Sequence, residues 1–332
     1  MEAEITSIQV GGRRFLSLIY QYGLFIVFGI MIIFFSTRNP NFFTAKNAMV
    51  ILQQAAPLGI AAVGMTFVLV TAGIDISIGQ NMYLSAVLVG MAMEAMTPSG
   101  FLGSFGSYVI IYAIALLAGG SVGALNGLVI SRFKFIPLLT SLATMAMARG
   151  VGLIVSKSKS YFVDKLGPIS NGSTGGIPYV VIIVIVLAIV FQYFLRRTPF
   201  GRHLMAIGND PIAAEKVGIN VARGVFWVYF ICGMLSGIAG ALSAGQVGSV
   251  AIYFADGNEF LVISAVVIGG TSLFGGKGSV LPGALIGIIL VTTMVNGMTM
   301  MNASPYAYRI VRGAIIFAAV MVDSINYKGE LR

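Results

Sequence analysis

Charged side chains are scarce in this sequence, since Asp, Glu, Lys and Arg make up 9% of its 332 residues. A soluble domain carries about 25% charged residues. Histidine, cysteine and tryptophan occur once each. With a single His and a single Cys, one chain cannot supply a zinc site of the usual nitrogen and sulfur ligands. Cys232 has no second cysteine, so an intramolecular disulfide is also excluded.

Motifs for catalysis and for nucleotide hydrolysis are missing as well. The stretch GGKGS at 275–279 lacks the spacing of G-x-x-x-x-G-K-[ST] and follows no predicted strand. His203 lies in a polar loop without a nearby nucleophile. We therefore expect the chain not to be an enzyme, and we expect no cofactor or metal on it.

Apolar residues, by contrast, make up 58% of the chain, and glycine occurs 42 times. A membrane-spanning helix needs about 20 predominantly apolar residues. Segments near this length lie at 17–36, 52–72, 80–97, 106–130, 137–156, 178–195, 224–245, 259–273, 280–300 and 307–323. The sequence thus predicts an all-α polytopic membrane protein with about ten transmembrane helices, in which glycines allow close helix packing.

The basic residues predict the orientation of these spans. Net charge is +9, yet no basic stripe with stacking aromatics accompanies it, so we expect no nucleic-acid partner. Placing both termini inside leaves more basic residues inside than outside, as the positive-inside rule favours. We expect a cytoplasmic segment at 1–16, a transmembrane domain at 17–323 with a cytoplasmic loop at 196–223, and a cytoplasmic tail at 324–332. The outer segment 157–177, rich in Gly, Ser and Pro, is expected to be a solvated connector or a surface for an external partner.

The loop 196–223 contains a short helix signal. Asn209 and Asp210 are N-cap residues, Pro211 suits the first helical position, and Gly218 is a helix stop. About two turns of helix are unstable alone in water, so docking on a partner is expected. The small side chains of Ala213 and Ala214 would let a partner's groove approach, with Glu215 and Lys216 beside them. The alternative is an amphipathic surface helix that completes the loop.

Polar residues within the spans are candidate functional sites, because charge is costly in lipid. Asp75 lies between Gly73 and Gly79, where the backbone is expected to be broken or re-entrant. Its carboxylate could cap the next helix through amides near Ser77, or line a path for a hydroxylated solute. Arg149 could bind a solute, pair with a carboxylate on another helix, or snorkel to the outer headgroups.

Two glycines and three asparagines complete the candidates. Gly269 and Gly270 end the short span 259–273, and we group them with Asp75, Ser77, Gly79 and Arg149 as candidates for the translocation path or gate. Asn126, Asn296 and Asn302 are expected to form interhelical hydrogen bonds.

Four segments in order carry a resemblance to a known family: GMTFVLVTAGIDISIG (64–79), SLATMAMARG (141–150), TPFGRHLMAIGNDPIAAEKVGI (198–219) and VVIGGTSLFGGKGSVLPGALIG (266–287). Nearly the whole chain resembles the membrane permease of bacterial monosaccharide ABC importers, the ribose and galactoside permease family. The resemblance implies a permease fold in the bacterial inner membrane, a second permease subunit and a periplasmic sugar-binding protein. It also implies a cytoplasmic ATPase with two nucleotide-binding modules, which would hold ATP and Mg. In that family the segment matching Asn209–Gly218 is the coupling helix that docks on the ATPase.

Three other classes stay open at this stage. The related branched-chain amino-acid permeases differ in substrate, and the segments GIDISIG and GGTSLFGGKG are nearer the sugar side. An ion-coupled secondary transporter needs ionisable residues in the membrane, and only Asp75, Glu94 and Arg149 could serve. A membrane-embedded enzyme would need a polar catalytic cluster, which the spans lack. Ribose or a similar pentose is our first expectation for the sugar.

Overall fold

The computed structural model describes residues 26–100 and 102–330. The expected segment 1–16, the first part of the span 17–36 and the last two residues of the tail 324–332 lie outside the described residues. The helices are Ile26–Arg38, α2 (Ala45–Val70), α3 (Ile78–Met96), α4 (Phe105–Phe133), α5 (Pro137–Ser156), α6 (Gly167–Ser170), α7 (Tyr179–Arg197), α8 (Pro199–Asn209), α9 (Pro211–Lys216), α10 (Val221–Val247), α11 (Asn258–Ile268), α12 (Leu285–Met300) and α13 (Pro305–Glu330).

The chain is therefore mostly helical, as expected, with a few short elements of other kinds. In the described part of the chain, four strands of two residues each form two antiparallel pairs: β1 (Tyr161–Phe162) with β4 (Ser249–Val250), and β2 (Ser173–Thr174) with β3 (Ile177–Pro178). One-turn 3-10 helices lie at Thr97–Ser99 and Asp164–Leu166, and a π-helical turn at Val280–Ala284 leads into α12.

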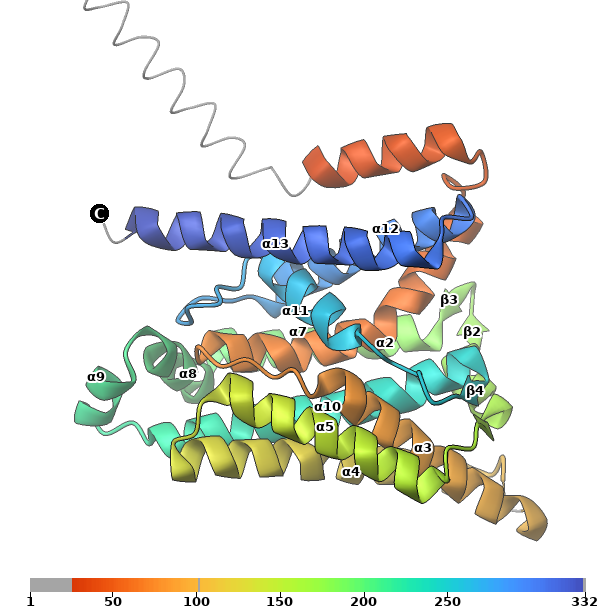
Figure 1. Ribbon diagram of the computed structural model, residues 1–332, viewed down its shortest axis with the longest axis horizontal. Coiled ribbons are helices and arrows are strands. Elements are labelled where there is room, and N and C mark those ends of the chain that lie inside the picture. Colours follow the sequence, from red (N-terminus) through yellow and green to blue (C-terminus); the bar gives the residue numbers. More distant parts are fainter. Residues whose placement is uncertain (1–25, 101, 331–332) are drawn as a thin grey trace, which may run out of the picture.

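Most of the long helices run along one direction, with α8 and α9 at one end and the strands at the other (Figure 1). Within the described residues, six helices are long and apolar enough to cross a membrane, and the expected count of about ten is not confirmed. The expected span 259–273 forms only the 11-residue α11, which ends before Gly269 and Gly270. The expected span 80–97 forms the 19-residue α3, whose buried Gln80, Asn81 and Ser85 make it more polar than a lipid-facing helix.

Helix packing at the centre depends on glycine. Gly119 and Gly123 of α4 lie against Gly233 and Gly237 of α10, and a Cβ on any of these would collide with backbone atoms of the facing helix. Close approach through small residues four apart is the usual packing mode of membrane helices. The α4–α10 pair therefore forms a rigid centre against which α3 also packs.

The helix α5 is polar on the inside and apolar on the outside. Its buried residues are Thr140, Ser141, Thr144, Ala148, Gly152 and Ser156. Leu139, Met147 and Ile154 on its other side are 50–77% exposed. This arrangement suits contact with lipid or a second membrane subunit, because lipid tails are as apolar as these side chains and provide no hydrophobic driving force to bury them.

The segment 157–177, expected to lie on the outer side, is not merely a solvated connector. Val163 and Leu166 are fully buried, and the Val163 amide donates to the Gly248 carbonyl at 2.9 Å. The two apolar side chains belong to a core cluster with α3, α4 and α10, so the segment closes this end of the bundle.

Candidate functional site

The expected short helix in the loop 196–223 is present as α9, and Asp210 caps it. Asp210 Oδ1 accepts hydrogen bonds from the amides of Ile212 (2.8 Å) and Ala213 (3.0 Å). Gly218, with φ of +86°, follows the helix, and its amide donates to the Glu215 carbonyl at 3.0 Å. A left-handed glycine of this kind ends helices because it has no Cβ to clash. Asn209 is not a second N-cap, because it is the last residue of the preceding helix α8.

The surface that α9 presents differs from the one expected. Ala214 is 3% exposed and packs in the chain's own core, so it is not offered to a partner. Ile212 and Val217 are instead 67% and 77% exposed. These apolar side chains stand on a helix at the very end of the bundle, beside exposed Glu215 and Lys216 (Figure 1). An apolar pair with a charged surround is the composition of a protein-docking surface.

The helix α8 was missed by the sequence analysis, although its start carries the same signal as that of α9. Thr198 accepts a hydrogen bond from the Gly201 amide at 3.4 Å, and Pro199 occupies the first turn. Thr-Pro here is the counterpart of Asp210-Pro211 and would have predicted the helix. The two helices meet directly, so α9 is held by α8 rather than by a free loop.

The segment 269–279 connects α8 to the membrane helices. The Gly276 amide donates to the Val70 carbonyl at the end of α2 (2.9 Å), and Gly208 of α8 lies so close to both that a Cβ would not fit. Arg196 donates to the Gly278 carbonyl at 3.2 Å. Gln192 Oε1 accepts from the amides of Val280 and Leu281 at 3.0 and 3.1 Å. The segment that follows α11 therefore contacts α8, the end of α2 and α7 at once.

Asp75 is the centre of a buried hydrogen-bond network in the break between α2 and α3. It is 1% exposed, and its Oδ1 accepts from the Ser77 amide (2.9 Å), Ser77 Oγ (2.5 Å) and Asn126 Nδ2 (3.3 Å). Asn126 Oδ1 in turn accepts from Thr144 Oγ1 at 2.6 Å. The capping alternative thus describes the local contact, and the expected interhelical role of Asn126 is confirmed. The network joins the break to α4 and α5.

Replacing Asp75 by leucine is expected to destabilise the protein, and replacement by asparagine much less. Leucine removes the acceptor for the Ser77 amide and hydroxyl and one of the two acceptors for Asn126 Nδ2. Each buried polar group left unpaired costs about 1–3 kcal/mol. Asparagine keeps one oxygen for these donors. The measurement is the thermal unfolding midpoint in detergent for the wild type and both variants. Equal midpoints for Asp75→Leu and the wild type would contradict this structural role.

The other glycine candidates lie where helices break and approach closely. A Cβ on Gly79 would collide with the Glu259 carboxylate and the Ala255 carbonyl, so the start of α3 touches the start of α11. Gly269 packs against the Gly283 carbonyl in the same way, and Gly270 has a left-handed φ of +89°. The break before α3 is covered by protein at Gly79, as irregular backbone in a membrane requires, whereas Gly270 is exposed.

Arg149 pairs with groups from two other elements. Its Nη1 donates to Gln80 Oε1 at 3.2 Å and lies 3.9 Å from Asp256 Oδ1, while its guanidinium lies over the Tyr253 ring at 5.8 Å from the ring centroid. Arg149 thus has a carboxylate partner, but Asp256 lies in the segment before α11 and not on another helix as expected. Arg312 of α13 also contacts this region, where its Nη1 donates to the Gly257 carbonyl at 3.1 Å.

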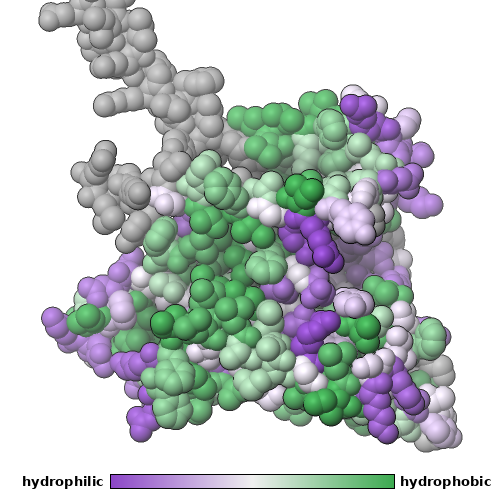
Figure 2. All heavy atoms as spheres, in the orientation of Figure 1, coloured by the Kyte–Doolittle hydropathy of each residue, from purple (hydrophilic) through white to green (hydrophobic). Residues whose placement is uncertain are grey.

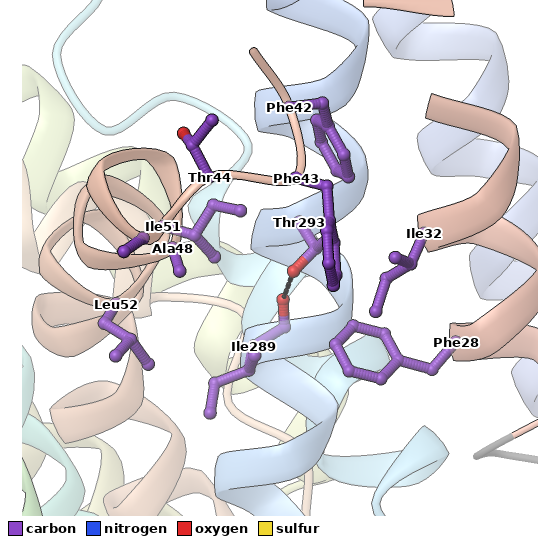
Figure 3. A pocket seen from close by; sticks show the side chains of 11 residues that line it. Phe28, Ile32, Phe42, Phe43, Thr44, Ala48, Ile51, Leu52, Ile289 and Thr293 are labelled. Atoms are coloured by element: carbon purple, nitrogen blue, oxygen red, sulfur yellow. Dashed lines mark hydrogen bonds between the residues drawn. The ribbon is translucent and has the colours of Figure 1, made fainter. Parts of the chain in front are cut away.

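A separate apolar pocket of about 400 Å³ lies between the helix Ile26–Arg38, α2 and α12 (Figure 3). Phe28, Ile32, Phe43 and Ile289 line it, and Thr293 Oγ1 donates to the Ile289 carbonyl of its own helix at 2.7 Å. With its threonine hydroxyl already bonded, this pocket suits hydrocarbon and offers little to a hydroxylated solute.

Comparisons with known proteins agree with the membrane architecture. A family model described as "Branched-chain amino acid transport system / permease component" matches residues 47–320. The ribose import permease protein RbsC of Escherichia coli K12 is 33% identical over 96% of this chain and 99% of its own. RbsC of Bacillus subtilis is 34% identical (91% and 92%), and the L-arabinose transport system permease protein AraH of Escherichia coli K12 is 32% identical (93% and 92%). No solved structure matches.

The family match extends over most of the chain, from α2 into α13, and the relatives are similar over nearly their whole length. This chain therefore belongs to the family of transport-system permease components that includes RbsC and AraH.

Proposed function

We propose that this chain is the membrane-spanning subunit of an ATP-driven ABC importer and that it carries a monosaccharide, ribose or a similar pentose, across the inner membrane. Three of the relatives compared are named as permeases for ribose or L-arabinose, and a further relative is named a probable ABC transporter permease protein. The observation that carries the proposal is the helix α9, which is capped by Asp210, held to the bundle by the buried Ala214, and flanked by the exposed side chains of Ile212 and Val217. ATP hydrolysis would then take place on a separate subunit.

In this proposal the segment Asn209–Gly218 is the coupling helix. Asp210 and Pro211 start it, Ala214 anchors it to the bundle, and Ile212, Ala213 and Val217 face the ATPase. Closure of two nucleotide-binding modules around ATP and Mg would push on α9. The contacts of Gly208 and Asn209 with the segment 269–279 would pass the movement to α11 and α2.

We further propose that the translocation path runs beside two breaks in the helices, the one between α2 and α3 and the one that follows α11. Gly79 and Arg149 lie on one side of it, and Gly269 and Gly270 lie at the hinge-like end of α11. Asp75 and Ser77 are buried and bonded to each other, so we assign them to support of the path and not to its lining. Discontinuous helices mark substrate sites in many transporters, which favours this placement.

The remaining parts of the system follow from the same proposal. A second copy of the permease would complete the path in the bilayer, and a periplasmic binding protein would deliver the sugar at the end formed by β1–β4. Both termini would be cytoplasmic, as would α8 and α9, because the basic loop 196–223 favours that side.

Branched-chain amino acids are the second candidate substrate, because the matching family model bears that description. The substrate panel of any transport assay should therefore include L-leucine beside D-ribose and L-arabinose. Ion-coupled transport without ATP is a third class, and the variant Asp75→Asn distinguishes it from the proposal. If Asp75 couples an ion, an amide cannot replace its carboxylate. If Asp75 only accepts hydrogen bonds, an amide can replace it.

The test is purification of the chain from its native membranes in a mild detergent, with mass spectrometry of the partners and an ATPase assay. We expect an ATPase with two nucleotide-binding modules to copurify. A chain that elutes alone and catalyses ion-driven uptake would overturn the proposal.

A further inference from the structure

We propose that Gln80, Arg149, Tyr253 and Asp256 form a site at which the permease itself binds the transported sugar, an inference that rests on the proposed function. The four side chains come from three elements: α3, α5 and the segment 251–257 that leads into α11. Gln80 is the link between the charges, since its Oε1 accepts from Arg149 at 3.2 Å and its Nε2 donates to Asp256 Oδ1 at 3.2 Å.

The cluster lies well inside the length of the bundle. Gln80 neighbours Asn81, whose Nδ2 donates to the carbonyls of Gly119 and Gly233 at 3.2 Å each, and these residues are near the middles of α4 and α10. Arg149 lies about two turns before the end of α5, which is about 10 Å at 1.5 Å per residue. The site is therefore away from the helix ends where charged side chains reach the headgroups.

Three of these side chains are nevertheless accessible. The side chains of Arg149 and Asp256 are 30% and 52% exposed, and Tyr253 is 70% exposed. Hydrophilic surface interrupts a largely apolar face between α13 and α5, where the segment before α11 crosses (Figure 2). Accessible charge at such depth is expected to face a water-filled path or a protein partner and not lipid.

The chemistry of the cluster fits a neutral polyol. A sugar hydroxyl both donates and accepts; Asp256 offers acceptors and Arg149 offers donors, while the buried Gln80 holds these two side chains in place. The charges of Arg149 and Asp256 offset each other, so the ligand needs no net charge. The open face of Tyr253 provides an apolar surface for the C–H face of a sugar ring, because an aromatic body with a polar tip serves both kinds of contact.

A buried carboxylate beside the cluster is a second observation that points to a ligand. Glu259 is 3% exposed, and its Oε2 has no hydrogen-bond partner in the described part of the chain. It lies against Gly79, the residue before Gln80, and in the first turn of α11 after Asp256. A buried acceptor without a donor is costly, so a donor supplied by the substrate or by water that accompanies it would stabilise this arrangement.

The test is saturation-transfer NMR on the purified chain in detergent, with D-ribose, L-arabinose, D-xylose and L-leucine as probes at millimolar concentration. We expect a pentose signal with the wild type and an approximately tenfold weaker signal with Tyr253→Ala and with Asp256→Asn. Tyr306→Ala, at an equally exposed tyrosine that begins α13, should retain the wild-type signal. Thermal midpoints of all variants show whether they are folded.

Equal pentose signals from the wild type, Tyr253→Ala and Asp256→Asn would overturn the inference. No sugar signal from the wild type, together with intact ATP-driven sugar uptake by the assembled transporter, would also overturn it while the proposed function stands. A signal from L-leucine and none from any sugar would overturn both the site and the choice of substrate.

Discussion

The double variant Ile212→Asp/Val217→Asp is expected to lose ATP-driven uptake by about 30-fold or more, because loss of a central apolar anchor costs an interface about 2 kcal/mol or more. Both side chains are exposed, Ile212 on α9 and Val217 at its C-cap, and neither belongs to the buried core. Aspartate there should leave membrane insertion and thermal stability unchanged while the ATPase no longer copurifies. The measurement is the amount of ATPase bound per permease, followed by uptake in proteoliposomes.

The matched control is Ile177→Asp/Val247→Asp, the same pair of changes on exposed residues of β3 and of the end of α10. These residues lie at the opposite end of the bundle, so this variant should bind the ATPase as the wild type does (Figure 1). If the α9 variant bound ATPase as well as the control, α9 would not be the docking helix.

Replacing Gly123 by alanine should lower the stability of the helix bundle. A Cβ there would press on the Tyr229 carbonyl and on Gly233 Cα, and overpacking between two backbones costs about 1–3 kcal/mol. We expect a thermal midpoint lower by about 5 °C, at roughly 2–4 °C per kcal/mol. The measurement is fluorescence-detected size-exclusion chromatography after heating in detergent.

Gly150→Ala is the control for helix propensity. A Cβ at Gly150 of α5 meets nothing within 4 Å, so alanine should be neutral or stabilising by up to about 1 kcal/mol. A result in which both glycine variants shift the midpoint equally would contradict the close α4–α10 contact.

Local sequence is enough to predict the start and end of α9, but not which of its side chains are buried and which are exposed. Capping by Asp210, proline in the first turn and a left-handed Gly218 all act within a few residues. The burial of Ala214 depends on packing against α8 and α10, which local patterns do not reveal. The exposed anchors Ile212 and Val217 were therefore assigned only with the structure.

The hydrogen-bond partners of the polar residues within the helix bundle could not be predicted from the sequence either. Asp75 is a candidate because a charge is costly within an apolar span, but its contact with Asn126 and the link to Thr144 join residues far apart in the chain. Arg149 was also a candidate, whereas Gln80, Tyr253 and Asp256 gave no local signal. The number of spans was uncertain for a related reason, since short helices such as α11 cross only part of the bundle and leave polar breaks that hydropathy cannot place.

The central claim is that this chain carries a sugar through the membrane at the expense of ATP hydrolysed by a partner. Its most direct test is uptake of radiolabelled D-ribose and L-arabinose into proteoliposomes that contain the permease, the copurifying ATPase and the binding protein. We predict accumulation with Mg-ATP, none without ATP, and none with the Ile212→Asp/Val217→Asp permease. Equal accumulation with and without ATP, driven by an ion gradient, would contradict the account.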